Sequence, residues 1–195
     1  MRELIHLLET NANVANALSA VASASVALLA LFVSVVSVAI SLWTLRVQRR
    51  HNILSVRPLP EITHVDYEDS LCVKIRNNGS GPMIIKSLDV SNGTESRSSL
   101  IEWMPTLPNS RPWSHFSHTL ENRSLLAGGQ INLLELTKYD AGIDAAYLDQ
   151  SFAQGRDATR AALSALTVSV NFTDVYNSAL PVYSKKLDWF GRHNT

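Results

Sequence analysis

The 195-residue sequence contains one cysteine, Cys72. A single cysteine excludes an intrachain disulfide and any metal site built from several thiolates, and it agrees with a reducing compartment. Motifs that cradle phosphates, bind zinc or carry a nucleophilic serine are also absent, including GxGxxG, HExxH, CxxC and GxSxG. We therefore expect no enzymatic activity, no catalytic residue, no metal and no cofactor.

No charged residue lies between Ala17 and Leu45. At about 1.5 Å per residue, a helix of this length is longer than the hydrocarbon core of a bilayer, which is about 30 Å thick. The sequence therefore predicts a single-pass membrane protein with one long N-terminal transmembrane helix.

The flanks of this run predict its orientation. Positive charge gathers after the run, whereas Arg2 is offset by Glu3 and Glu9 before it. By the positive-inside bias, we expect a cell inner-membrane protein with the N-terminus outside and the C-terminal domain in the cytoplasm. Because the charge follows the run and the run exceeds the apolar core of a signal peptide, we expect an uncleaved anchor. The predicted membrane-interface residues are Trp43, Arg46, Arg49 and Arg50.

Small and polar residues recur through the apolar run at alternating steps of three and four. We call them the seam: Asn13, Asn16, Ala20, Ser23, Ala27, Ala30, Ser34, Ser37, Ser41 and Thr44. Helices associate in lipid through close approach at Ala and Ser and through interhelical hydrogen bonds. We predict that the seam faces copies of itself in a left-handed parallel bundle. The alternative is that the spacing is coincidental, since Ala and Ser are common in membrane spans.

The remaining sequence predicts one soluble domain and a short connection. We expect an N-terminal segment at 1–16 with a helix break at its asparagines, a transmembrane helix at 17–51 and a linker at 52–60. Pro58 and Pro60 end the helix in that linker. Residues 61–195 form the soluble domain.

From Glu61 onward the hydrophobic period changes to two, which is typical of strands. We predict an antiparallel, immunoglobulin-like β-sandwich with a helical insertion at about 144–165, interrupted near Gly155. The turn segment NNGSGP is expected to join two neighbouring strands as a hairpin, with Cys72 on the outer face. About seven strands are expected, at 62–67, 71–76, 83–90, 113–120, 130–137, 166–172 and 179–187.

Other polar and aromatic residues suggest no chemistry. His115 and His118 lie three apart, so on a strand they would point to opposite faces and could not share a metal. Asp66 and its acidic neighbours Glu68 and Asp69 are expected to be a solvated strand end. The tryptophans Trp103, Trp113 and Trp189 are expected to pack in the core or at its surface.

Four segments carry a resemblance to known proteins: RPLPEI at 57–62, NNGSGPMII at 77–85, LLAGGQINLLEL at 125–136 and NFTDVYN at 171–177. With the single span before them, they resemble small bacterial single-pass membrane proteins that have a cytoplasmic β-sandwich. The layout alone also resembles membrane effectors of bacterial anti-phage defence, in which a sensing domain controls a span that assembles and perturbs the membrane. This likeness implies an antiviral role.

Two functions follow from the seam. A bundle of four or more helices could enclose a lumen, which would make the protein a homo-oligomeric channel or pore-type effector controlled by the β-sandwich. A dimer or trimer would close as a dry contact, which would make it a membrane-tethered module that binds a protein partner. Expected partners are itself, membrane lipid and a regulatory ligand or protein. Residues 52–195 carry a formal charge of −2, and we see no nucleic-acid signal.

Overall fold

The computed structural model describes residues 2–138 and 145–193 and divides into two compact units, residues 1–52 and 53–195. The first unit consists of the helix α1 (Arg2–Ser55), which is 54 residues and about 80 Å long. The helix continues through the asparagines at 11–16, so the expected break there is wrong. Asparagine costs only a few tenths of a kcal/mol per residue relative to alanine, which a cooperative helix of this length tolerates.

The helix α1 ends at Ser55, four residues later than the expected boundary at 51. A proline ring clashes with the carbonyl of the residue four positions earlier, so Pro58 is incompatible with a helix that continues past Leu54 and Ser55. The segment without secondary structure between the helix and the first strand is therefore only Val56–Leu59.

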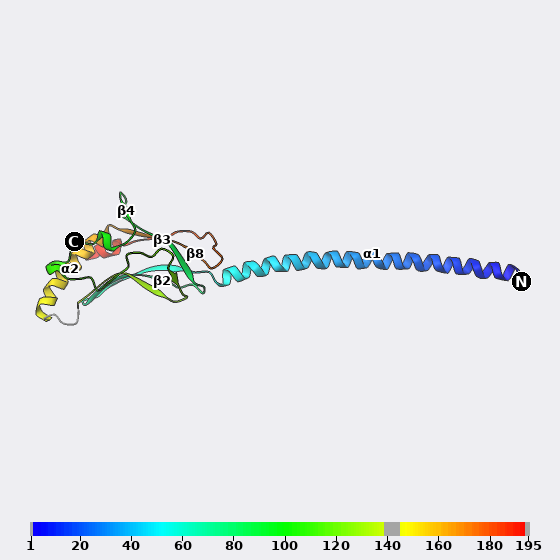
Figure 1. Cartoon of the computed structure of the whole chain (residues 1–195), viewed down its shortest axis with the longest axis horizontal. Helices are drawn as coiled ribbons and strands as arrows, with labels where there is room; N and C mark the ends of the chain where they lie inside the picture. Colours follow the sequence, from blue (N-terminus) through cyan, green and yellow to red (C-terminus); the bar gives the residue numbers. More distant parts are fainter. Residues whose placement is uncertain (1, 139–144, 194–195) are drawn as a thin grey trace. The chain divides into compact units, whose positions relative to one another are not determined.

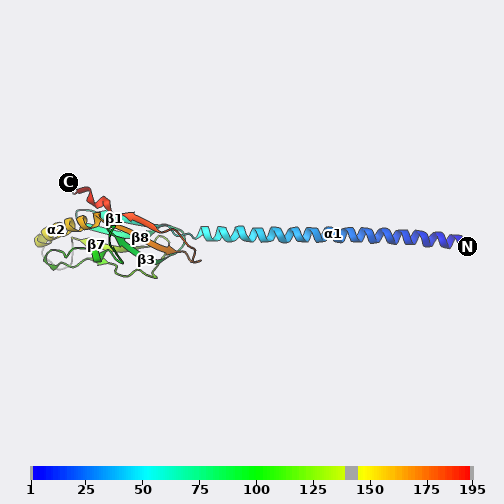
Figure 2. The ribbon, with the colours of Figure 1, turned by 90° about the horizontal axis from the view of Figure 1, so that it is seen from above.

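The second unit contains two antiparallel sheets, shown from two sides in Figures 1 and 2. One sheet has the order β1 (Pro60–Asp66), β2 (Ser70–Asn77), β7 (Gln130–Thr137) and β5 (His115–Phe116). The other has the order β4 (Ser96–Arg97), β3 (Met83–Ser91), β8 (Thr167–Thr173) and β9 (Tyr183–Lys186), with β6 (Ser124–Leu125) also on β3. The predicted fold class is confirmed. The described residues form nine strands and not seven, because β4 and β6 have only two residues each and show no period.

The core lies between the two sheets. Leu71, Val73 and Ile75 of β2 are buried, as their alternation predicts, and they join one cluster with β3 and β8 residues such as Ile85 and Val170. Cys72 points to the other face and was expected to be exposed, but it is only 6% exposed. Its Cα partners in the neighbouring strands are Val65 and Glu135, so it lies at the centre of its sheet, where the flanking side chains shield it.

The expected hairpin between β2 and β3 is wrong, because the two strands belong to different sheets. Both edges of β2 are already paired, one with β1 and the other with β7, so β3 has no edge to join. The NNGSGP segment therefore crosses from one sheet to the other. Its glycines allow close approach of two backbones: a Cβ on Gly81 would lie 1.9 Å from the Val56 carbonyl oxygen.

The helix α2 (Ala145–Ser164) occupies the predicted insertion and lies at the end of the sandwich opposite the NNGSGP crossing (Figure 2). It runs without a break through Gly155, so the expected interruption there is wrong. Glycine fits at this position because a Cβ would lie 3.1 Å from the Leu107 side chain. That glycine serves packing and not a turn. Three short 3₁₀ helices complete the fold: η1 (Ile101–Trp103), η2 (Pro108–Ser110) and η3 (Asp188–His193). The strand expected at 113–120 is reduced to β5.

Candidate functional site

The seam predicted from the sequence lies entirely on α1, and each of its residues is exposed. Within α1, the segment Asn11–Ser55 is long and apolar enough to cross a membrane, with a mean hydropathy of 2.5 in its most apolar window and no buried residue in that window. An apolar helix that buries nothing within its own chain fits a single-pass membrane anchor. The candidate site is therefore the surface of this helix.

Four of the five seam hydroxyl groups donate to their own helix, as does that of Ser25 outside the seam. Ser34 donates to the carbonyl of Ala30 at 2.8 Å, and Ser37 donates to that of Val33 at 2.8 Å. Ser41 and Thr44 repeat the pattern one turn later, at 2.8 and 2.9 Å. Each donor is therefore satisfied without water or a partner, which lowers the cost of placing a hydroxyl in lipid. Each oxygen keeps both of its lone pairs free to accept a hydrogen bond or contact an ion.

The heptad spacing of the seam does not match a straight helix. Residues repeated every seven positions drift by about 20° per heptad around an ideal α-helix. Between Asn13 and Thr44 this drift reaches about 90°, so two straight helices would lose contact along part of the seam. Contact along its whole length needs a left-handed supercoil, which requires at least one further helix.

The predicted interface residues follow directly on the same helix. Trp43 is 67% exposed and Arg46, Arg49 and Arg50 are exposed as well. Trp43, Arg46 and Arg50 are spaced by three and four residues, so they share one side of α1. This arrangement spreads an indole and two guanidinium groups over about 10 Å along one side of the helix.

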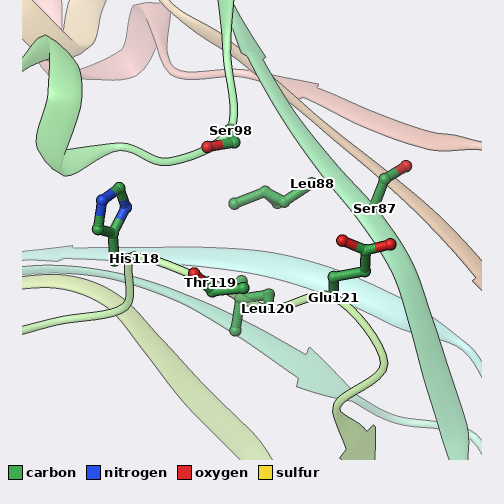
Figure 3. A pocket seen from close by; sticks show the side chains of 7 residues that line it. All are labelled: Ser87, Leu88, Ser98, His118, Thr119, Leu120 and Glu121. Carbon is green, nitrogen blue, oxygen red and sulfur yellow. The ribbon is translucent and has the colours of Figure 1, made fainter.

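The sandwich contains a small polar hollow of about 180 Å³, shown in Figure 3. Its walls include Leu88 and Ser87 of β3, His118 and Glu121 from the segment after β5, and Ser98. This volume is below the roughly 300 Å³ at which pockets for drug-sized ligands begin. The hollow therefore suits an ion or a molecule of a few atoms.

A polar network lies beside this hollow. Ser99 donates to Glu102 at 2.6 Å, Ser98 donates to the same carboxylate at 3.0 Å, and the Nδ1 atom of His118 lies 3.3 Å from the Ser99 hydroxyl. The hydrogen bonds from Ser99 and Ser98, with smaller contributions from His118 and Arg97, lower the pKa of Glu102. The serine donates to the acid and not to the histidine, so this is not the arrangement of a nucleophilic triad.

The two histidines considered from the sequence are not brought together. His115 faces Glu135 at 3.4 Å, whereas His118 belongs to the network beside the hollow. Within the described residues, no group of three or more His, Cys, Asp or Glu side chains is placed to hold a metal.

Asp66 is the residue for which sequence reasoning was most wrong. Its side chain was expected to be solvated, but it is 0% exposed and lies 2.7 Å from Arg160 of α2 and 2.9 Å from Arg192 of η3. Beside it, the His64 ring packs against Trp189 in a tilted arrangement, with ring centroids 4.2 Å apart. Burial, then Lys185 and Arg192, lower the pKa of His64. This cluster fastens α2 and η3 to β1, and no local sequence pattern reveals it.

An apolar groove of about 390 Å³ lies between η1 and β5, with Ile101, Met104, Leu107, Trp113 and Phe116 among its lining residues. It is next to β5, which is an edge strand of its sheet.

No protein-family model, curated protein or solved structure matches this chain. The likeness to anti-phage effectors therefore remains a prediction.

Proposed function

We propose that this chain is a self-associating single-pass membrane protein, in which α1 anchors the protein and packs against copies of itself along the seam. The β-sandwich is then the cytoplasmic domain that binds a ligand or a protein partner. One observation carries the proposal: between residues 26 and 44 a row of small residues follows one side of a helix whose other positions are mainly valine, leucine and isoleucine, whereas between residues 12 and 25 small residues occupy the other sides as well.

The physical argument comes from what lipid favours. Valine and leucine gain no free energy by leaving acyl chains for another helix, so a large apolar interface provides no drive for association in a bilayer. Small side chains allow close backbone contact and dispersion attraction along the whole helix. Because the hydroxyl groups of Ser34, Ser37, Ser41 and Thr44 are satisfied internally, they need no interhelical hydrogen bonds, and close packing is the main source of affinity there.

Cysteine cross-linking in membranes tests this packing. In a Cys72→Ser background, single cysteines at the seam positions Ala27, Ser34 and Ser41 should form disulfide-linked dimers on oxidation. Matched cysteines at Leu28, Val35 and Leu42, each one residue later, should form several-fold fewer. Equal cross-linking at the two sets would refute the seam as the contact surface.

An ion channel is the second candidate, and the hydroxyl oxygens of the seam favour it. With their hydrogens directed to backbone carbonyls, Ser34, Ser37, Ser41 and Thr44 would line a lumen with oxygen lone pairs. Such a lining carries partial negative charge, so it should conduct cations in preference to anions. A lumen needs four or more helices, whereas a dimer or trimer would act as a tether for the β-sandwich.

Planar bilayer recordings of the purified chain test the channel. We expect cation-selective currents that are abolished by the double variant Ser34→Leu with Ser37→Leu. The control variant Val35→Leu with Val38→Leu changes positions outside the seam and should retain the currents. Currents that survive the seam variant, or an oligomer of two or three chains in nanodiscs, would exclude the channel.

A cytoplasmic β-sandwich and a role in anti-phage defence are further parts of the proposal, supported by the arginines at 46, 49 and 50 and by the layout of the chain. A membrane-impermeant thiol reagent should modify a cysteine placed at Thr94 in broken cells but not in intact cells. Expression of the intact chain should reduce phage plating, and the double seam variant should not. Labelling in intact cells would show that the β-sandwich lies outside the cytoplasm. Equal phage plating with the intact chain and with the double seam variant would refute the defence role.

A further inference from the structure

One end of the β-sandwich is formed by four segments, residues 56–59, 78–82, 126–129 and 174–182, which we call the entry end because the chain enters the sandwich there. Asn77 joins three of them: it accepts the N–H of Leu59 at 3.1 Å and donates to the carbonyls of Gly81 at 2.8 Å and Leu126 at 3.3 Å. The fourth follows β8, whose Thr173 is the Cα partner of Ile84 near the start of β3. Figures 1 and 2 both show this orange-brown loop at the same end.

Large apolar side chains point outward from the tips of these loops. Leu59, Leu126, Val175, Tyr176 and Val182 are between 51% and 71% exposed. They are five of the eight large apolar side chains exposed among the described residues from 56 onward. Concentration of exposed apolar residues on one end of a domain indicates an interaction surface.

The loop that carries Val175 and Tyr176 is held in place and does not collapse onto the core. The Asp174 carboxylate accepts the backbone N–H groups of Tyr176 and Ser178, both at 2.9 Å. Burial opposes ionisation of Asp174, but the hydrogen bonds from Ser178 and Tyr176 outweigh it and lower its pKa. The apolar tips are thus presented to the surroundings by an ordered turn.

Arginines gather around these tips: Arg57, Arg76 and Arg123 are exposed at or next to the entry end. Three carboxylates lie in the same part of the sandwich. Glu61, the Cα partner of Arg76, accepts the Asn78 amide, Asp174 is buried in its turn, and Glu121, two residues before Arg123, is exposed. Apolar tips surrounded by arginines are the composition of surfaces that bind the interface of an anionic bilayer.

We propose that the entry end is a lipid-binding surface, whose apolar tips enter the headgroup layer while Arg57, Arg76 and Arg123 contact anionic headgroups of the leaflet that α1 leaves. The proposal rests on α1 as a membrane anchor, as proposed above, but not on self-association. A second copy is a poorer occupant, because arginines would then face arginines in a symmetric bundle.

Fluorescence quenching of the full chain in lipid vesicles tests the surface. In the Cys72→Ser background, an environment-sensitive fluorophore is attached to a cysteine at Leu126, and in a matched control to one at Thr94 in the turn between β3 and β4. Vesicles contain phosphatidylcholine with a headgroup-labelled nitroxide lipid, with or without one quarter phosphatidylglycerol. We expect quenching at 126 to exceed that at 94 by about twofold or more. The excess should grow with phosphatidylglycerol and fall in a variant that combines Arg57→Gln and Arg123→Gln.

Equal quenching at the two positions would overturn the proposal. So would a signal at 126 that depends on the ratio of protein to lipid and not on phosphatidylglycerol, because a second copy would then be the occupant. Flotation of the same vesicles separates the two proposals. A chain that floats but shows equal quenching refutes the lipid surface alone, whereas a chain that does not float refutes the anchor and the lipid surface together.

Discussion

Replacement of Asn77 by alanine should destabilise the β-sandwich more than any single change at its surface. The Asn77 side chain is 0% exposed, and its amide oxygen accepts the N–H groups of Leu59 at 3.1 Å and Gly79 at 3.0 Å. Its nitrogen donates to Gly81 at 2.8 Å, to Leu125 at 3.2 Å and to Leu126 at 3.3 Å. Alanine would remove these bonds and leave the two N–H groups and the three carbonyls without a partner from this side chain.

The size of the effect follows from this arrangement. A typical hydrogen bond contributes about 0.5–1.5 kcal/mol net, and a buried group left without a partner costs about 1–3 kcal/mol. Because the five contacts share one side chain and are not additive, we expect Asn77→Ala to lower the free energy of unfolding by about 3 kcal/mol. For a domain of this size, that corresponds to a melting temperature lower by about 10 °C.

Asn77→Asp provides a second test. The carboxylate would still accept from Leu59 and Gly79, but it would face the carbonyl oxygens of Gly81 and Leu125 without a hydrogen to donate. This variant should be at least as unstable as Asn77→Ala at neutral pH. It should recover part of the loss at low pH, where a protonated carboxyl group can donate.

Thermal unfolding of the full chain in nanodiscs, followed by tryptophan fluorescence, measures these changes, since three of the four tryptophans lie in the sandwich. The matched control is Asn78→Ala, because Asn78 is the next residue, is exposed and has its amide on Glu61. We expect this control to change stability by less than about 0.5 kcal/mol. If Asn77→Ala lowered the melting temperature no more than Asn78→Ala does, the structural role of the Asn77 amide would be refuted.

Three further predictions concern buried ionisable groups. Asp66→Asn leaves Arg160 and Arg192 without their buried carboxylate, and it should lower the free energy of unfolding in a denaturant titration by about 3 kcal/mol. The control Asp157→Asn, at a side chain that is 66% exposed, should lower it by less than about 0.5 kcal/mol. Burial and the charge of Lys185 hold the pKa of His64 below its ordinary 6.5, so stability should fall as the pH drops below 6.5, and His64→Gln should reduce that dependence. Burial raises the pKa of Cys72 to about 11, so mass spectrometry should find no alkylation by iodoacetamide at pH 8 until the sandwich is unfolded.

Local patterns predicted much of the fold because they reflect local geometry. The alternation of Leu71, Val73 and Ile75 fixes which face of β2 is buried, and the structure agrees. The partner of a strand is not a local property, and the expected pairing of β2 with β3 was wrong because β2 is already paired with β1 and β7. Strands of two residues, such as β5, are too short to show a period.

The candidate site divides in the same way. The spacing of the seam could be recognised from the sequence because an α-helix places residues three and four apart on one side. The internal hydrogen bonds of Ser34 and Ser37 follow from the same helix geometry, yet they become evident only once the side chains are placed. The entry end could not be predicted, because Leu59, Leu126 and Tyr176 come from loops separated by dozens of residues.

The sequence by itself determined that the chain has an apolar helix long enough to span a bilayer, because 29 consecutive residues without charge allow few other structures. It also determined a β domain, through the change of hydrophobic period after Pro60. Only the tertiary structure decided that Asp66 and Asn77 are buried and bonded, since their partners lie on other elements, 94 residues away for Arg160 and 48 residues away for Leu125. Burial of a polar side chain depends on which distant groups satisfy it, and no local pattern records those groups.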